Sequence, residues 1–151
     1  MLCRPAEPAD FPALADMRWR LKMEDAPTTD AAAYDAFVAA FVDWAGRDEA
    51  YVHWVAEDQG RLLGAMSVAQ VRKPPAPDEP DGCWGYLTNA YVYPDARNAG
   101  AGRALLAQII AWARAGGLEL MIVWPSEPAY PFYERAGFAR GRDPLMLELE
   151  L

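Results

Sequence analysis

A turn with two closely spaced glycines joins a strand-like run to a helical run in this chain. The segment at 94–106 reads PDARNAGAGRALL. Before it, WGYLTNAYVY at 84–93 has the apolar and aromatic content of a strand, and after it Leu106 and Ile109 fall on one helical face. Because a simple turn needs one glycine at most, the second glycine indicates that another molecule approaches the backbone here.

This turn has the chemistry of a phosphate cradle. The first amides of a helix have no intrahelical carbonyl partner, so they can bind an anion. Gly100 and Gly102 permit a positive φ, or the close approach of a phosphate that a Cβ would block. Arg97 and Arg103 could add charge-assisted contacts.

Two common phosphate motifs do not fit the turn. A P-loop requires lysine after its last glycine, and no glycine in the chain precedes a lysine. A dinucleotide fingerprint requires a third glycine where Leu105 stands, and it opens a chain with a βαβ unit instead of following several other elements. A nucleotide-binding domain is therefore the weaker alternative.

Two segments resemble the signatures of one family. LTNAYVYPDARNAGAGRALL at 87–106 is similar to the coenzyme A loop of the GNAT superfamily of N-acetyltransferases, in which Arg97, Gly100 and Gly102 match the pattern Arg/Gln-x-x-Gly-x-Gly/Ala. PSEPAYPFYERAGF at 125–138 resembles the second signature of the same family. Both occur in the family's order, separated by a predicted helix and a buried strand.

The resemblance implies an α+β protein with the GNAT fold, a central mixed and mostly antiparallel sheet flanked by helices, in a single domain over 1–151. The sequence periodicity agrees with this architecture. It predicts strands at 1–6, 51–58, 61–72, 84–93, 118–124, 138–142 and 144–150, helices at 10–24, 30–45, 101–115 and 129–136, and a proline-rich loop at 73–82. Gln59-Gly60 is expected to be a hairpin turn, and Asp10 could cap the first helix.

Composition excludes several classes of protein. The chain has 151 residues and 53% hydrophobic content, enough for one compact domain. Its net charge of −8 argues against a nucleic-acid partner. No apolar run is long enough for a membrane span and no secretion signal is seen, so we expect no membrane partner and a cytoplasmic location. Cys3 and Cys83 lack the spacing of a disulfide framework or a metal site.

The family resemblance also implies an activity and a co-substrate. Such an enzyme transfers an acetyl group from acetyl-CoA to a primary amine, here of a small molecule or peptide, by direct attack in a ternary complex. The sequence is compatible with this, because neither cysteine lies in a recognisable nucleophile setting beside a histidine. No metal is implied. The lone His53 lies in a strand pattern, where packing or solvent exposure is the simpler role.

The resemblance assigns cofactor-binding residues. Backbone groups around Tyr91 and Val92 would pair with the pantetheine arm as an added strand does. Ser126 stands where the family often has an asparagine near that arm, although it could simply cap the following helix. The amides expected to hold the diphosphate belong to Asn98, Ala99, Gly100, Ala101, Gly102 and Arg103.

Family position points to Tyr133 as the general acid that protonates the leaving thiolate. A phenol of pKa about 10 can donate to a thiolate whose conjugate acid has a pKa near 8.5 at a cost of about 2 kcal/mol. A core tyrosine beside Phe132 is the alternative, and one side chain can do both.

The acceptor side is the least specified part of the sequence. Trp84, Tyr86 and Asn89 precede the cofactor strand and could face the acceptor, although core packing is the simpler role for the two aromatic residues. The carboxylates considered as a general base are Glu24, Asp25, Glu57 and Asp58, each equally well a surface charge, and a water chain would need none of them. A non-catalytic acyl-CoA-binding module remains the alternative function, and the late strands could support a homodimer.

Overall fold

The computed structural model describes residues 1–24, 27 and 30–149. Within them the strands are β1 (Leu2–Pro5), β2 (Tyr51–Asp58), β3 (Arg61–Arg72), β4 (Cys83–Val92) and β5 (Met121–Val123). The helices are α1 (Phe11–Met23), α2 (Ala31–Arg47), α3 (Ala101–Ala115) and α4 (Tyr130–Arg135), with 3₁₀ turns at Pro8–Asp10, Pro94–Ala96 and Glu127–Ala129. No described helix combines the length and apolar character that a membrane crossing requires.

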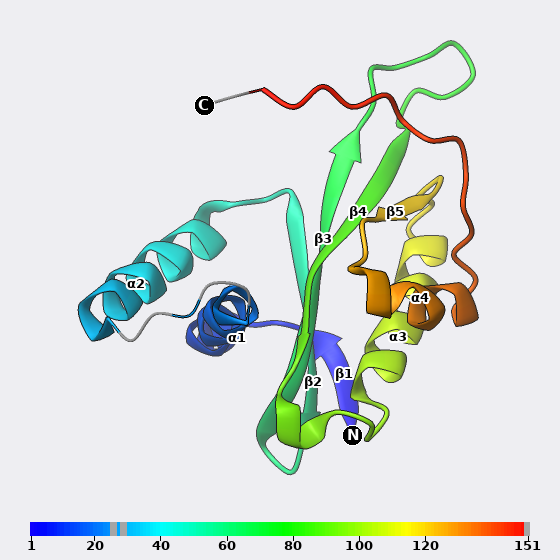
Figure 1. The fold of residues 1–151 in the computed structure, drawn as a ribbon. Coiled ribbons are helices and arrows are strands. Elements are labelled where there is room, and N and C mark those ends of the chain that lie inside the picture. The colour runs from blue at the N-terminus through cyan, green and yellow to red at the C-terminus, as the bar shows by residue number, and fades with distance from the viewer. Residues whose placement is uncertain (25–26, 28–29, 150–151) are drawn as a thin grey trace.

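The strands form one mixed sheet in the order β1-β2-β3-β4-β5. Neighbours from β1 to β4 are antiparallel, whereas β4 and β5 are parallel. A parallel pair requires a crossover, and α3 supplies it. Helices α1 and α2 cover one face of the sheet, and α3 and α4 cover the other (Figure 1). The predicted mixed, mostly antiparallel sheet between helices is confirmed.

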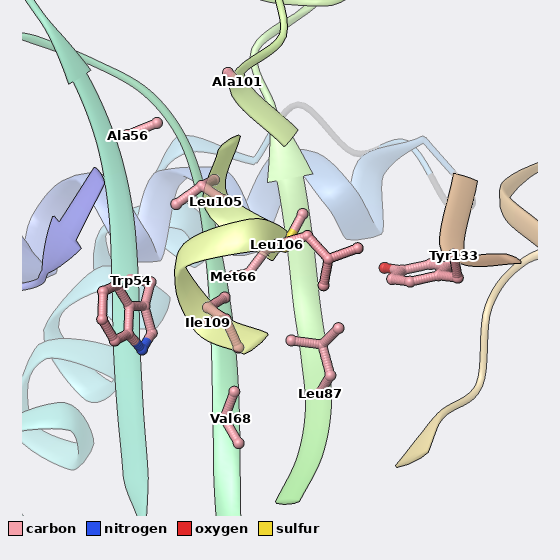
Figure 2. Packing of buried hydrophobic residues seen from close by; sticks show 10 residues of the cluster. All are labelled: Trp54, Ala56, Met66, Val68, Leu87, Ala101, Leu105, Leu106, Ile109 and Tyr133. Atoms are coloured by element: carbon pink, nitrogen blue, oxygen red, sulfur yellow. The ribbon is translucent and has the colours of Figure 1, made fainter. Parts of the chain in front are cut away.

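The core between the sheet and α3 anchors the helix that follows the glycine turn. Leu105, Leu106 and Ile109 are fully buried against residues of the sheet such as Val68 and Leu87 (Figure 2). Full burial of each such side chain stabilises the fold by about 1.5–3 kcal/mol. The N-terminal end of α3 is therefore held rigidly beside β4.

The other face has its own core and a well-capped helix. Leu14 and Met17 of α1 and Phe41 of α2 pack against Val55 of the sheet. The Asp30 carboxylate accepts hydrogen bonds from the amides of Ala32 and Ala33, which caps the start of α2. Thus α1 and α2 lie as a pair on the face opposite α3.

The expected cap by Asp10 is not formed. Asp10 stands at the N-cap position of α1, but its side chain makes no capping hydrogen bond to that helix. Its carboxylate accepts from the Glu7 amide at 2.8 Å and from the Arg4 guanidinium at 2.7 Å. The nearby cation and the preceding 3₁₀ turn therefore take the oxygens that a cap would use.

The C-terminal part of the sheet differs from expectation. The hairpin at Gln59-Gly60 is confirmed, with both residues at positive φ. The strand predicted at 118–124 is reduced to Met121–Val123. The strands predicted at 138–142 and 144–150 are absent from the described residues, 139–149 having no regular secondary structure. Alternation alone does not make a strand, because a strand also needs a neighbour for its backbone groups.

His53 is buried in the core below α2. Its Nδ1 lies 2.7 Å from the Ser67 hydroxyl, and aromatic rings including Phe41 and Trp44 surround it. Burial lowers the pKa of His53 below its ordinary value, although Asp48 acts in the opposite direction. The neutral imidazole is therefore the form that the fold accommodates, and packing is its role.

Replacing His53 with Gln should weaken the dependence of the free energy of unfolding on pH below neutrality. The unfolded chain binds a proton at this histidine more readily than the folded chain does, so stability is lost as pH falls below about 6.5. Gln keeps a partner for Ser67 without titrating. Urea unfolding between pH 7.5 and 5 should show a slope smaller by up to about 1.4 kcal/mol per pH unit in the variant. Parallel curves for both proteins would contradict this assignment.

Candidate active site

The start of α3 presents a row of unpartnered backbone amides. The first helical bond runs from the Ala104 amide to the Gly100 carbonyl at 3.0 Å. Within the described part of the chain, the amides from Gly100 to Arg103 have no protein acceptor. Asn98 and Gly100 both have positive φ, at 67° and 87°, which curves the preceding turn into the concave form that binds anions.

There is space in front of these amides. A Cβ added at Gly100 would meet no atom within 4 Å, so its left-handed φ is what selects glycine there. At Gly102 an added Cβ would lie 3.5 Å from the Phe132 ring of α4, an ordinary contact. Arg103 is exposed one residue further along the helix. A diphosphate fits the donor set of this turn.

Strand β4 separates from β5 beside the turn. The parallel pairing ends at Leu87 and Val123, while β4 continues to Val92. A register shift against β3 accompanies Asn89, whose φ is 56°. Because β5 ends at Val123, no strand among the described residues lies beside Asn89–Val92 on that edge.

The opposite edge of β4 lies very close to β3. A Cβ at Gly64 would be 2.7 Å from the Tyr91 carbonyl oxygen, so glycine is required for this approach. The Tyr91 ring is buried among residues of α1 and α2. Tyr91 and Val92 are thus held against β3 on one edge, and no described strand lies along the other, where an added extended segment would pair.

Arg97 connects the glycine turn to the end of α1. Its Nη2 donates to the Glu24 carboxylate at 2.7 Å and its Nε donates to the Val92 carbonyl at 2.9 Å. The guanidinium also lies over the Tyr91 ring, 5.3 Å from its centre. Sequence reasoning placed Arg97 on the phosphate; in this structure a carboxylate and a carbonyl already engage it.

Tyr133 lies on α4 with its hydroxyl directed toward Leu106 of α3 (Figure 2). The side chain is buried, and burial raises the pKa of its hydroxyl above the ordinary value. Within the described residues the hydroxyl has no hydrogen-bond partner, while the ring packs edge-on against Phe132 and Phe138. The phenol is therefore a proton donor without a protein acceptor, and it is also a core residue.

Ser126 stands at the start of the 3₁₀ turn Glu127–Ala129. Its side chain makes no capping hydrogen bond, although its carbonyl accepts from the Ala129 amide at 2.9 Å. The simple cap considered from the sequence is therefore not formed. The hydroxyl is left available between β5 and α4.

The three residues assigned to the acceptor side share β4 but differ in setting. Leu87 packs against α3, so the alternating Trp84 and Tyr86 face the side of the sheet on which α1 and α2 lie. The Tyr86 ring contacts the Trp124 ring edge-on at 5.0 Å. The Asn89 Oδ1 accepts a 3.4 Å contact from Arg18 of α1, a residue that the sequence did not single out.

The carboxylates considered as a base do not gather at the split between β4 and β5. Glu57 pairs with Arg4 at 2.9 Å and Asp58 with the N-terminal amine at 3.6 Å, both on β2. Glu24 is the partner of Arg97. Asp25 lies outside the described residues.

Sequence reasoning missed a polar cluster centred on Asp16. Its carboxylate accepts from Arg20, Tyr34 and Tyr93, each at 2.8 Å. Burial raises the pKa of Asp16, but the three hydrogen bonds outweigh burial and hold it below its usual range. Clefts of about 560 and 470 Å³ share Asp16 and Arg20 in their linings. The spacing of four residues between Asp16 and Arg20 was visible in the sequence, whereas the two tyrosines come from distant elements.

Comparisons with known proteins identify relatives of this chain. A model described as the acetyltransferase (GNAT) family matches residues 11–138. The glucosamine 6-phosphate N-acetyltransferase of Trypanosoma brucei brucei is 34% identical over 65 residues, 43% of this chain and 44% of that protein. The chain thus matches less than half the length of this curated relative.

Solved structures share the fold over nearly the whole chain. The GCN5-related N-acetyltransferase from Ralstonia eutropha has a TM-score of 0.74 and 28% identity, with 97% of each chain covered. A predicted acetyltransferase from Clostridium acetobutylicum, solved with acetyl-CoA, has a TM-score of 0.75 and 22% identity over 97% of this chain and 95% of that one. The glycine turn at the start of α3, the split strands and the family match agree: the chain belongs to the GNAT family of acetyltransferases.

Proposed function

We propose that this protein transfers an acetyl group from acetyl-CoA to a primary amine of a small molecule or peptide. One observation carries the proposal: four consecutive amides, from Gly100 to Arg103, have no acceptor among the described residues, and they begin α3 next to the point where β4 leaves β5. Such a row of donors suits a diphosphate, and the open edge of β4 suits an amide-bearing arm. Family membership supports an acyltransferase.

The protein's own groups divide the work of binding. The amides from Gly100 to Arg103 would hold the diphosphate, whereas the Ala99 amide, also assigned from the sequence, already donates to the Ala96 carbonyl at 3.4 Å. The exposed Arg103 adds a positive charge. The Tyr91 carbonyl faces Gly64 of β3, and the Val92 carbonyl already accepts from Arg97, so the other backbone groups around these two residues would orient the pantetheine arm. Ser126 follows β5, and its hydroxyl, which makes no capping hydrogen bond, would meet the same arm.

Acetyl-CoA would supply the activated thioester, and Tyr133 would supply a proton. The raised pKa of the Tyr133 hydroxyl keeps it protonated at neutral pH. As the amine attacks the thioester carbonyl and the carbon–sulfur bond breaks, this hydroxyl can protonate the leaving thiolate. The described carboxylates considered as a base are in ion pairs, so we assign loss of the ammonium proton to water.

Arg18 favours an acceptor that carries a carboxylate or phosphate. It is half-buried at the Asn89 bulge and makes no ion pair among the described residues. Two other arginines close to the site, Arg20 and Arg97, are both bound to carboxylates. The Trypanosoma brucei brucei relative is named a glucosamine 6-phosphate N-acetyltransferase. Glucosamine 6-phosphate is an amine that carries a phosphate, so this name supports an acceptor of the proposed class.

Replacing Gly102 with Asp should weaken acetyl-CoA binding without weakening the fold. A negative charge in the first helical turn is favourable for a helix but repels a diphosphate at the same amides. We expect KM for acetyl-CoA to rise at least tenfold, with no fall in the melting temperature. Gln108→Asp on the exposed middle of α3 makes the same charge change and should leave KM unaltered. Equal KM values for the two variants would show that the diphosphate does not bind at this turn.

Replacing Tyr133 with Phe should lower kcat at least tenfold and leave KM for acetyl-CoA unchanged, because only the proton donor is lost and the ring still packs. Tyr130→Phe on the same helix is the matched control. Release of free thiol with an amine panel is the measurement. A wild-type rate in the Tyr133 variant would show that this residue only packs in the core. If the wild type releases no thiol with any amine, the protein is better described as a non-catalytic acyl-CoA-binding module.

Replacing Arg18 with Gln should raise KM about tenfold for amines that carry a carboxylate or phosphate, because a hydrogen bond to a charged group is lost. Uncharged amines and acetyl-CoA should keep their KM values. Lys22→Gln, exposed on the same helix, removes the same charge and serves as the control. If charged and uncharged amines respond alike, Arg18 does not select the acceptor.

A further inference from the structure

The segment that joins β4 to α3, residues 94–100, contributes little to the protein core. Ala96 is buried, and the other residues of the segment are exposed. Its backbone is a succession of turns that begins at Tyr93. The Tyr93 carbonyl accepts from the Ala96 amide at 2.9 Å, and the Ala96 carbonyl accepts from the Ala99 amide at 3.4 Å. Because each turn is bonded to the one before it, the position of the segment depends on where Tyr93 is held.

A carboxylate on α1 holds Tyr93. The Tyr93 hydroxyl donates to Asp16 Oδ2 at 2.8 Å. Asp16 lies between Leu14 and Met17, whose side chains are fully buried, so the helix that carries the carboxylate is fixed in the core. The hydrogen bonds to Asp16 hold its pKa below the usual range, and it is ionised at neutral pH. A hydrogen bond to an ionised acceptor is stronger than one between neutral groups.

Two guanidinium groups contact the ring of the same tyrosine. Arg20 of α1 lies 5.5 Å from the centre of the Tyr93 ring, and Arg61 of β3 lies 5.9 Å from it. Arg20 also donates to Asp16 Oδ2 at 2.8 Å, so it balances the charge of the carboxylate while it contacts the ring. Both the hydroxyl and the ring of Tyr93 are thus held by α1.

Two ion pairs also join the segment to other elements. Asp95 pairs with Arg61 at 2.8 Å, and Arg97 pairs with Glu24 at 2.7 Å. All four side chains are between 44% and 64% exposed. Exposed pairs contribute little to stability, because water and salt screen them. The half-buried bond between hydroxyl and carboxylate is therefore the contact on which the position of the segment most depends.

We propose that Asp16 is a positioning residue for coenzyme A, which acts through the Tyr93 hydroxyl to fix where the amides from Gly100 to Arg103 meet the diphosphate. Donors that are already in place need no ordering when the ligand binds, so a loosely held turn would bind the same diphosphate more weakly. The role rests on the proposed function, since it needs a diphosphate at this turn. Asp16 itself need not touch the ligand.

Tyr34 of α2 provides a matched control for Tyr93. Its hydroxyl donates to the other oxygen of Asp16, also at 2.8 Å. Replacing either tyrosine with Phe removes one hydroxyl and one hydrogen bond to the same carboxylate, and keeps the ring. Tyr93 continues into the segment before α3, whereas Tyr34 joins α2 to α1. If the cluster only stabilises the protein, the two variants should behave alike, but if Asp16 positions the turn they should differ.

Calorimetric titration with coenzyme A measures this difference. Tyr93→Phe should raise the dissociation constant about tenfold, because a hydrogen bond to a charged group is lost, and Tyr34→Phe should change it by less than about twofold. KM for acetyl-CoA should rise in the Tyr93 variant with kcat unchanged, while both variants lose similar amounts of melting temperature. Equal dissociation constants in the two variants would overturn the role of Asp16 alone. A wild type that binds no coenzyme A would contradict the proposed function, and this role with it.

Amide hydrogen exchange tests the same contact without any ligand. In Tyr93→Phe the Ala96 and Ala99 amides should exchange at least tenfold faster than in the wild type, because the turns that they close are no longer held at their start. In Tyr34→Phe both amides should keep their wild-type rates. Unchanged exchange in the Tyr93 variant would contradict the proposal even if coenzyme A binds.

A double-mutant cycle tests whether Tyr93 acts through Asp16. Asp16→Ala removes the acceptor, so adding Tyr93→Phe to this variant should leave the dissociation constant for coenzyme A unchanged. The same tyrosine substitution should raise that constant in the otherwise wild-type chain. Equal effects of Tyr93→Phe in the two backgrounds would show that the hydroxyl acts independently of Asp16.

Discussion

The separation of β4 from β5 determines the rest of the site. If the two strands stayed paired beyond Leu87 and Val123, no free edge would exist at Tyr91 and Val92. The bulge at Asn89 and the close approach at Gly64 lie beyond the point of separation, where β4 stays bound to β3 alone. The same geometry delivers the chain into the glycine turn, so the open edge and the unpartnered amides of α3 lie in succession along one continuous segment.

The attraction of the glycine turn for an anion comes from nearby groups and not from the overall charge of the protein. The protein carries a net charge of −8, which disfavours an anionic ligand overall. The amides at the start of α3 offset that field with the positive end of the helix dipole. Arg97 contributes less than its charge indicates because Glu24 neutralises it, and the pair instead links the turn to the end of α1.

The sequence predicts the features that depend on neighbouring residues, but it does not predict the contacts between distant segments. The glycine turn, α3 and the short helix with Tyr133 follow from periodicity and turn chemistry, which act between near neighbours. The Arg97–Glu24 pair and the Asp16 cluster join distant segments, and no local pattern reports them. The strands predicted at 138–142 and 144–150 have the right alternation, but residues 139–149 pair with no strand of the described sheet, and alternation alone does not show whether a neighbour is present.

A calorimetric titration with coenzyme A measures whether the amides at the start of α3 bind a diphosphate. We expect saturable heat, one site per chain, and a micromolar dissociation constant that rises with salt concentration, because charged contacts dominate the binding. Absence of heat at millimolar coenzyme A would contradict diphosphate binding at α3, since neither turnover nor sensing is possible unless the protein binds coenzyme A.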